Sequence, residues 1–200
     1  MPEAEKVYDI SWSHEILGES VPNKEKIFSI FEDHTDIIVK GGREVEFGHK
    51  VNLAGGKSNL ILDCRILDGN PADATIYGEV IARIHANYGM VPRDTITDGG
   101  YASKDNARIA QERGIINIVF NKIKGSLQNI VRSKNMETRL KKWRSGIEAV
   151  ISNLKRGYEL FRCEWKTRAR FDAKVHWNVI VYNMRVMTGA LLAKMQTQMQ

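Results

Sequence analysis

The order of apolar segments predicts an α/β domain in which helices pack against strands of mixed direction. Short runs rich in Ile, Val and Leu alternate with longer stretches whose apolar residues recur every three or four positions. Glycine-rich turn signals separate these segments. The chain has 200 residues, of which 42% are hydrophobic and 27% charged. This is long enough for one domain with its own core.

The N-terminal part is expected to supply most of the strands. Residues 1–25 show no period and predict an irregular lead-in, so the domain is placed at 26–200. Hairpin turns are expected at 40–43 and 55–58, because both contain a Gly-Gly pair. The strands are predicted at 27–31, 37–39, 44–53 and 59–67, with the last two forming an antiparallel pair.

Helices and short strands alternate in the rest of the chain. Asp73 is a candidate cap for an amphipathic helix that ends at Gly89, and Ser103 is a candidate cap for a helix through Arg113. A long helix is expected to begin near Met136. Residues 94–101 are predicted to be a short strand that runs into a glycine turn. A further short strand is predicted at 115–120, and a largely buried helix at 171–195.

Charge is distributed unevenly along the chain. Residues 1–121 carry 13 Lys or Arg and 19 Asp or Glu, a balance of −6. Residues 122–200 carry 17 Lys or Arg and 5 Asp or Glu, a balance of +12. A basic half of this size is typical of proteins that bind nucleic acid, although a solvated cationic surface has the same composition.

The composition also bears on the compartment. The two cysteines, Cys64 and Cys163, lie far apart and outside any metal-binding spacing, which favours a reducing cytoplasm over a disulfide framework. The apolar stretch 175–195 contains too many polar residues to span a membrane, so no membrane partner is expected.

Asp98 is the first candidate for chemistry. It follows a short apolar strand and precedes a Gly-Gly pair, the position where open α/β sheets place ligands. Glycines there allow a phosphate or metal to approach the backbone. An Asp-Gly pair is equally typical of a plain turn.

Glu148 is the second candidate. Arg144, Glu148, Ser152 and Lys155 are spaced so that they form one polar row on the long helix. The row is either an acid flanked by phosphate-binding cations, or an Arg–Glu pair on a solvated face worth about 0.3–0.5 kcal/mol. His49 and His85 have no neighbours at metal-ligand spacing, so structural roles are expected for both.

Three motifs follow one another along the chain. The first runs from Phe47-Gly48-His49-Lys50 to Gly69-Asn70-Pro71-Ala72-Asp73. The second is Thr97-Asp98-Gly99-Gly100-Tyr101-Ala102-Ser103. The third contains Arg144, Glu148 and Lys155. Their spacing fits a signature in which two residues separate Tyr from Arg, three separate Arg from Glu, and six separate Glu from Lys. Position 141 of this chain is Lys instead of the Tyr. Together they resemble the DDE-type transposases of bacterial insertion sequences, over residues 21–183.

The resemblance implies a fold and a chemistry. The fold is a ribonuclease-H-like mixed sheet flanked by helices. The activity is metal-dependent phosphodiester cleavage and strand transfer at transposon ends, with DNA ends and target DNA as partners and a homodimer as a further expectation by analogy. Asp98 and Glu148 are implied to be catalytic and to bind Mg²⁺ or Mn²⁺. Arg144, Lys155 and Arg156 are implied to contact DNA.

The family's first aspartate has no counterpart at the expected place. It normally lies on the central strand, in an Asp-Gly/Thr-Thr sequence, and no such sequence occurs between Met1 and Phe47. We therefore expect a catalytic domain that is truncated before its first central strand and impaired in activity. Two alternatives stay open: a non-catalytic DNA-binding remnant, or another ribonuclease-H-like nuclease such as a resolvase.

Overall fold

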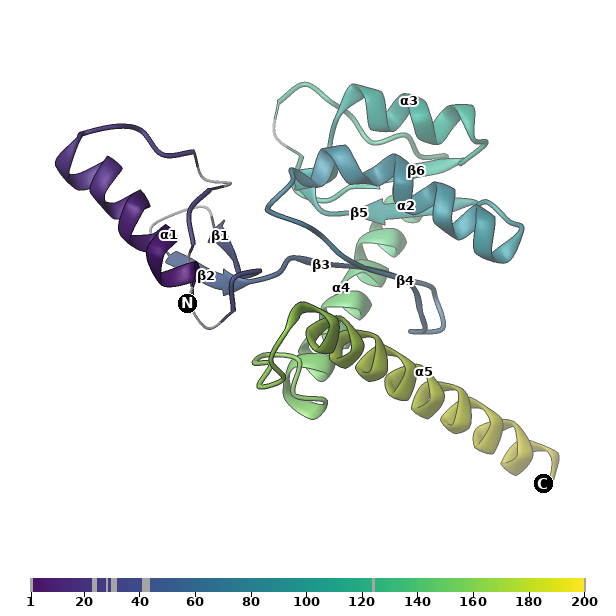
Figure 1. Cartoon of the computed structure of the whole chain (residues 1–200). Coiled ribbons are helices and arrows are strands. Elements are labelled where there is room, and N and C mark those ends of the chain that lie inside the picture. The colour runs from purple at the N-terminus through teal and green to yellow at the C-terminus, as the bar shows by residue number, and fades with distance from the viewer. Residues whose placement is uncertain are drawn as a thin grey trace.

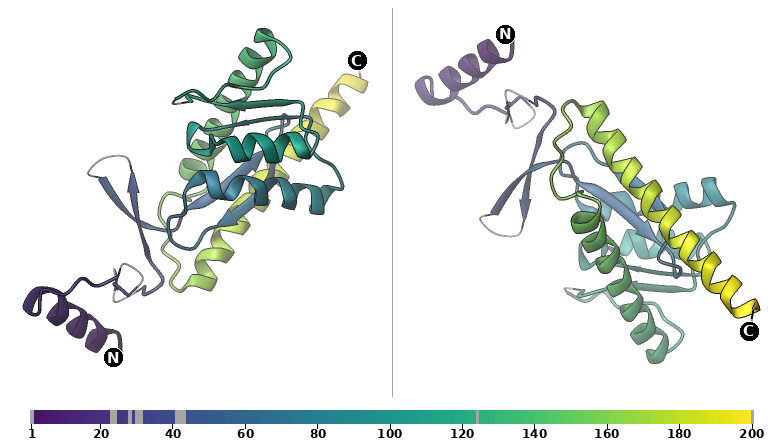
Figure 2. Two further views of the ribbon diagram at one scale, coloured as in Figure 1. Left: turned by 90° about the horizontal axis from the view of Figure 1, so that it is seen from above. Right: turned by 90° about the horizontal axis from the view of Figure 1, so that it is seen from below.

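The structure, a computed structural model, describes residues 2–22, 25–27, 29, 32–40, 44–123 and 125–199. Within these ranges the strands form three two-stranded sheets, of which two are antiparallel and one is parallel. The helices α2 (Asp73–Tyr88) and α3 (Lys104–Glu112) lie on one side of the strands between residues 51 and 120, and α4 (Lys134–Gly157) and α5 (Arg168–Gln198) lie on the other (Figures 1 and 2). The predicted α/β class with mixed strand directions is confirmed, but a single central sheet is not seen in the described ranges.

The first two sheets divide a segment that the sequence predicts as one strand. β1 (Asp36–Lys40) pairs with β2 (Glu44–Gly48), which confirms the first hairpin. The prediction of one strand over 44–53 is wrong, because β3 (Val51–Gly55) pairs separately with β4 (Ile61–Ile66). The break follows Gly48, whose φ is 145°. The turn at 41–43 and residues 28, 30 and 31 of the predicted first strand lie outside the described residues.

The third sheet is parallel and positions Asp98. β5 (Asp94–Thr97) pairs with β6 (Asn117–Phe120), and the connection contains a 3-10 turn (Gly99–Tyr101) and α3 (Lys104–Glu112). The predicted cap at Ser103 is confirmed, since its hydroxyl accepts a hydrogen bond from the Asn106 N–H at 3.0 Å.

The helix α2 (Asp73–Tyr88) ends as expected at Gly89, which has a left-handed φ of 66°. Its predicted cap is wrong. Ala72 occupies the cap position without a side-chain hydrogen bond, because the Asp73 carboxylate lies one residue inside the helix and pairs with Lys50 instead.

Two hydrophobic clusters hold the helices to the strands. Tyr77 and Ile81 of α2 pack with Ala110 of α3 and Phe120 of β6. On the other side, Ile61 of β4 packs with residues of α4 (Lys134–Gly157) and α5 (Arg168–Gln198). Buried apolar area of this kind stabilises the fold by about 25 cal/mol per Å². The long helix α4 is therefore fixed against both β5–β6 and β3–β4.

Two expectations about the chain ends are wrong. Residues 2–16 are not irregular, since α1 (Pro2–Ser11) continues into a π-helix (Trp12–Ile16). Pro2 at the first helical position and good helix formers such as Ala4 and Glu5 explain this without apolar periodicity. The helix α5 is not largely buried, because it extends beyond the strands it packs against (Figure 1).

Candidate active site

The turn after β5 holds Asp98 by backbone packing. Its Oδ1 accepts a hydrogen bond from the Gly99 N–H at 3.3 Å. A Cβ atom at Gly99 would lie 2.7 Å from the carbonyl oxygens of both Asn121 and Lys122. Only glycine therefore lets this turn lie against the end of β6. The carboxylate of Asp98 stays accessible, with 52% of the side chain exposed.

A polar framework, made of Lys50 and Asp73, packs against the same turn. Lys50 Nζ lies 2.6 Å from Asp73 Oδ1 and donates to the Pro71 carbonyl at 2.9 Å. Asp73 approaches Gly100 so closely that a Cβ there would lie 2.5 Å from its Oδ2. Burial, and the negative charge of Asp73, raise the pKa of Tyr101 to about 12. The framework thus connects β3, α2 and the Asp98 turn.

The helix α4 brings Arg144 and Glu148 to Asp98. Arg144 Nη2 lies 2.6 Å from Asp98 Oδ2, and its Nη1 lies 2.6 Å from Glu148 Oε1. One guanidinium therefore joins carboxylates that are fifty residues apart in the chain. Arg144 is only 16% exposed, whereas Glu148 is 59% exposed.

This bridge is electrostatically favourable for the arginine. Burial alone would lower the pKa of Arg144, but hydrogen bonds and attraction to Glu148 and Asp98 raise it above its ordinary value. The guanidinium therefore stays charged and neutralises part of the carboxylate pair. Each carboxylate retains lone pairs that face solvent.

The other two cations named by the sequence lie further along α4. Lys155 is seven residues beyond Glu148, which corresponds to two helical turns on the same face and about 10 Å. Its side chain lines a cleft of about 1120 Å³ between β2, β3 and the segment that joins α4 to α5. Arg156 is exposed, and neither residue forms an ion pair with the described part of the chain.

The donor set determines which cofactor the site can accept. Asp98 and Glu148 offer carboxylate oxygens, which hard divalent cations prefer. A cluster of three or more His, Cys, Asp or Glu side chains suited to a metal is not found where the structure is described. The site therefore brings the carboxylates of Asp98 and Glu148 together around Arg144.

A comparison with known protein families decides the assignment. The Transposase DDE domain family matches residues 33–184, about three quarters of the chain. The chain belongs to this transposase family. This match confirms the family recognised from the motifs. Membership implies DNA as the substrate and nuclease and strand-transfer chemistry. No curated protein and no solved structure matches this transposase domain. Its described helices include none long and apolar enough to cross a membrane.

Sequence reasoning missed one polar cluster of the transposase domain. The side chain of His49 is only 2% exposed and bonds both to Asp36 at 2.9 Å and to His34 at 2.8 Å. His34 in turn lies 2.8 Å from Glu32. His49 thus has the structural surroundings expected of it, but no spacing in the sequence indicated His34 as its neighbour.

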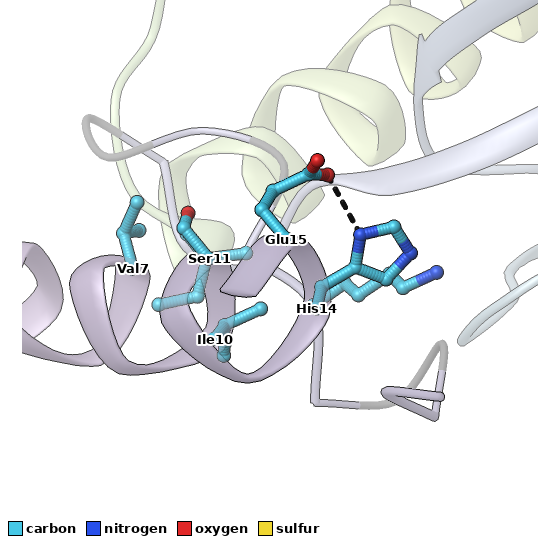
Figure 3. Close-up of a pocket in the computed structure, with 7 residues that line it drawn as sticks. Val7, Ile10, Ser11, His14 and Glu15 are labelled. Carbon is cyan, nitrogen blue, oxygen red and sulfur yellow. Dashed lines mark hydrogen bonds and ion pairs between the residues drawn. The ribbon is translucent and has the colours of Figure 1, made fainter. Parts of the chain in front are cut away.

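A second hollow lies away from the acidic residues. It has a volume of about 250 Å³ between the N-terminal helix and residues 26–27, and its lining includes Val7, His14 and Glu15 (Figure 3). His14 Nδ1 lies 2.7 Å from Glu15 Oε1, and both side chains are more than half exposed. An isolated surface pair of this kind does not indicate a reaction.

Proposed function

We propose that this domain cleaves phosphodiester bonds and transfers strands at transposon ends, with Asp98 and Glu148 as the metal-binding carboxylates. The convergence of both carboxylates on Arg144 is the observation that supports the proposal most strongly. The parallel β5–β6 pair between α2–α3 and α4 is consistent with a ribonuclease-H-like fold.

The donor set suits Mg²⁺ or Mn²⁺. Mg²⁺ is commonly held in proteins by one or two carboxylates, with substrate phosphates and water completing the shell. When bound, such an ion polarises the phosphate and lowers the pKa of an attached water. Arg144 would have to release at least one carboxylate, and its guanidinium suits bidentate binding of a DNA phosphate.

The remaining cations are proposed to hold the DNA backbone. Lys155 lies on the same face of α4 as Glu148, and Arg156 adjoins it, so a strand leaving the carboxylates can follow the helix. We propose that activity is low, because a two-carboxylate site holds metal ions less firmly than a three-carboxylate site.

Nicking of supercoiled plasmid DNA in Mn²⁺ tests the proposal. Asp98→Ala and Glu148→Ala should each abolish nicking by the wild-type chain. Asp105→Ala, at an 80% exposed aspartate on α3, is the matched control and should leave it unchanged. Nicking that survives both site substitutions rejects the assignment of these carboxylates.

A non-catalytic DNA-binding role is the second candidate. The balance of +12 over residues 122–200 and the pairing of both carboxylates with Arg144 favour it. This role predicts no nicking in Mg²⁺ or Mn²⁺. It also predicts that the affinity for DNA falls steeply as the salt concentration rises. Measuring the binding constant at several salt concentrations, beside the nicking assay, separates the two candidates.

A further inference from the structure

The polar framework of Lys50 and Asp73 lies beside the Asp98 turn and has no part in the function proposed above. Lys50 directly precedes β3, and Asp73 is the first residue of α2. Lys50 Nζ lies 2.6 Å from Asp73 Oδ1, with 26% and 30% of the two side chains exposed. A partly buried ion pair beside a functional carboxylate can serve packing alone, or it can determine where that carboxylate lies.

Asp73 divides its two carboxylate oxygens between Lys50 and the turn. Oδ1 faces the ammonium group, whereas Oδ2 lies so close to Gly100 that an added Cβ would be 2.5 Å away. Gly100 is two residues beyond Asp98 and is enclosed by the hydrogen bond from the Tyr101 N–H to the Asp98 carbonyl, at 3.1 Å. The position of Asp73 therefore limits how the backbone of this turn can lie against α2.

Two neutral hydrogen bonds hold the far end of the turn at Tyr101. The Asn52 side-chain amide donates to the Tyr101 hydroxyl at 2.6 Å, and the Asn106 side-chain amide donates to the Tyr101 carbonyl at 2.8 Å. Both donors are buried, at 7% and 3% exposure. These bonds fix the turn one residue further from Asp98 than the contact with Asp73 does. The framework therefore supports the part of the turn that is closer to the functional carboxylate.

The surroundings of the Tyr101 hydroxyl indicate that Asp73 and Asp98 approach the same group. Burial raises the pKa of this hydroxyl most, and the negative charge of Asp73 raises it further, to about 12. The charge of Asp98 acts in the same direction on the pKa, while the hydrogen bond from Asn52 opposes it. Both carboxylates thus lie within electrostatic range of one hydroxyl.

Asp98 depends on this backbone for its position once a ligand replaces Arg144. Its hydrogen bond from the Gly99 N–H, at 3.3 Å, belongs to the same turn and moves with it. A displacement of about 1 Å in a reacting group can reduce a rate about 100-fold. The groups that hold a functional side chain from behind therefore contribute to its chemistry.

We propose that Asp73, held in place by Lys50, is a positioning residue for Asp98. The carboxylate of Asp73 fixes the turn from the side of α2, and the ammonium group of Lys50 keeps that carboxylate against Gly100. Without Lys50, an unpaired and partly exposed carboxylate would turn to water and release the turn. The effect on metal binding rests on the proposed function, whereas the effect on the turn is independent of it.

Lys50→Met tests the effect on metal binding by its sign. Removal of a cation near a metal site strengthens Mn²⁺ binding if Lys50 acts only through its charge. If the pair positions Asp98, the Mn²⁺ affinity should instead fall about tenfold, as it does when a supporting contact of a metal ligand is lost. Calorimetry without DNA measures this change, and Lys50→Arg, which keeps the cation, should retain most of the affinity. Unchanged or stronger Mn²⁺ binding in Lys50→Met overturns the proposal.

Arg65→Met is the matched control for Lys50→Met. Arg65 of β4 pairs with Glu79, which lies six residues beyond Asp73 on α2. The control therefore removes another cation that joins a strand to the same helix. Its Mn²⁺ affinity should equal that of the wild type, and urea denaturation shows whether the two variants lose similar stability. An equal loss of affinity in Arg65→Met would contradict the proposal, because any loosening of α2 would then have the same effect.

Hydrogen exchange in Asp73→Asn tests the hold on the turn without any metal. The N–H groups of Tyr101 and Ala102 donate to the carbonyls of Asp98 and Gly99, both at 3.1 Å, so their exchange reports opening of the turn. The substitution keeps the size of the side chain and removes its charge. Exchange of both amides should become about tenfold faster, as expected for the loss of one charged hydrogen bond.

The N–H of Ala107 in α3, which donates to the Ser103 carbonyl at 3.1 Å, is the internal control and should exchange at the wild-type rate. Wild-type exchange at Tyr101 and Ala102 in Asp73→Asn overturns the proposal. Faster exchange there in a chain that binds no Mn²⁺ would support the hold of the pair on the turn and reject Asp98 as a metal ligand, so the two failures are distinguishable.

Discussion

Two clusters of acids and bases differ in what surrounds them. At the end of β5, Asp98 and Glu148 are more than half exposed and share the guanidinium of Arg144. Beside β1, the buried ring of His49 joins Asp36 to His34, and His34 joins Glu32. The first cluster presents acceptors to solvent, whereas the second directs its polar atoms at one another.

The hydrogen-bond pattern of the histidine cluster specifies its protons. His49 donates from Nδ1 to Asp36, so its neutral Nε2 accepts from Nδ1–H of His34. The other ring nitrogen of His34 lies 2.8 Å from Glu32 Oε2. A further proton on His49 would set two N–H groups against each other.

Similar side chains thus serve different purposes according to their access to solvent. A closed network joins Asp36 of β1 to the start of α5, where the His49 ring contacts Phe171 at a centroid distance of 5.0 Å. The solvent-exposed cluster of Asp98 and Glu148 can exchange its internal partner, Arg144, for a ligand.

The largest effect is expected from His49→Ala. The change removes two buried hydrogen bonds and leaves a cavity beside Phe171, so the free energy of unfolding should fall by about 3 kcal/mol. Urea denaturation measures this loss. His85→Ala is the control, because His85 is exposed and should change stability little. Equal stabilities of the two variants would contradict a structural role for the cluster.

Gly99→Ala should act on the acidic cluster through the backbone. The added Cβ would meet two carbonyl oxygens at 2.7 Å, so the turn must shift, at a cost of about 2 kcal/mol. Asp98 should move with it and lose its contact with Arg144. Gly189→Ala is the control, because no atom lies within 4 Å of a Cβ there. A Gly99→Ala chain as stable as the wild type would show that the turn is not tightly packed.

Arg144→Gln should affect metal binding more than stability. Without the guanidinium, Asp98 and Glu148 repel each other, and a divalent cation has no internal competitor. Mn²⁺ affinity in the absence of DNA should rise about tenfold, or about 1.4 kcal/mol, as measured by calorimetry. Arg139→Gln, an exposed arginine on the same helix, is the control and should leave the affinity unchanged. Weaker Mn²⁺ binding in Arg144→Gln would contradict the competition.

The sequence predicted those parts of the acidic cluster that local pattern encodes. Helical spacing placed Arg144 and Glu148 on one face of α4, and the Gly-Gly pair after Asp98 indicated a close turn. Contact between Asp98 and α4 depends on packing in three dimensions, and it was inferred only from the family resemblance. The metal-binding and DNA-binding roles stay predictions, because geometry alone does not test them.

The errors in the fold have a common physical origin in long-range contacts. The predicted strand over 44–53 breaks because His49 and Lys50 find partners in Asp36 and Asp73, which local β-propensity does not register. The apolar content of α5 predicted burial, but hydrophobicity alone does not distinguish a buried helix face from an exposed apolar one. The histidine cluster joins residues whose spacing follows no period.

The smallest effect is expected from pH. Burial lowers the pKa of His49 below its ordinary 6.5, so the unfolded chain binds this proton more readily than the folded chain. The stabilisation is complete above 6.5 and should be lost as pH falls through the lowered pKa of the folded state. Arg168 and His34 favour the lowering, whereas Asp36 opposes it.

Urea denaturation at several pH values, compared between the wild type and His49→Gln, measures this dependence. The variant should lack the loss just below 6.5. The Thr167 N–H bond and His34 lower the pKa of Glu32 below 4.5, so its contribution is lost only at more acidic pH in both proteins. Parallel profiles between neutral pH and 4.5 would show that His49 is not the titrating group.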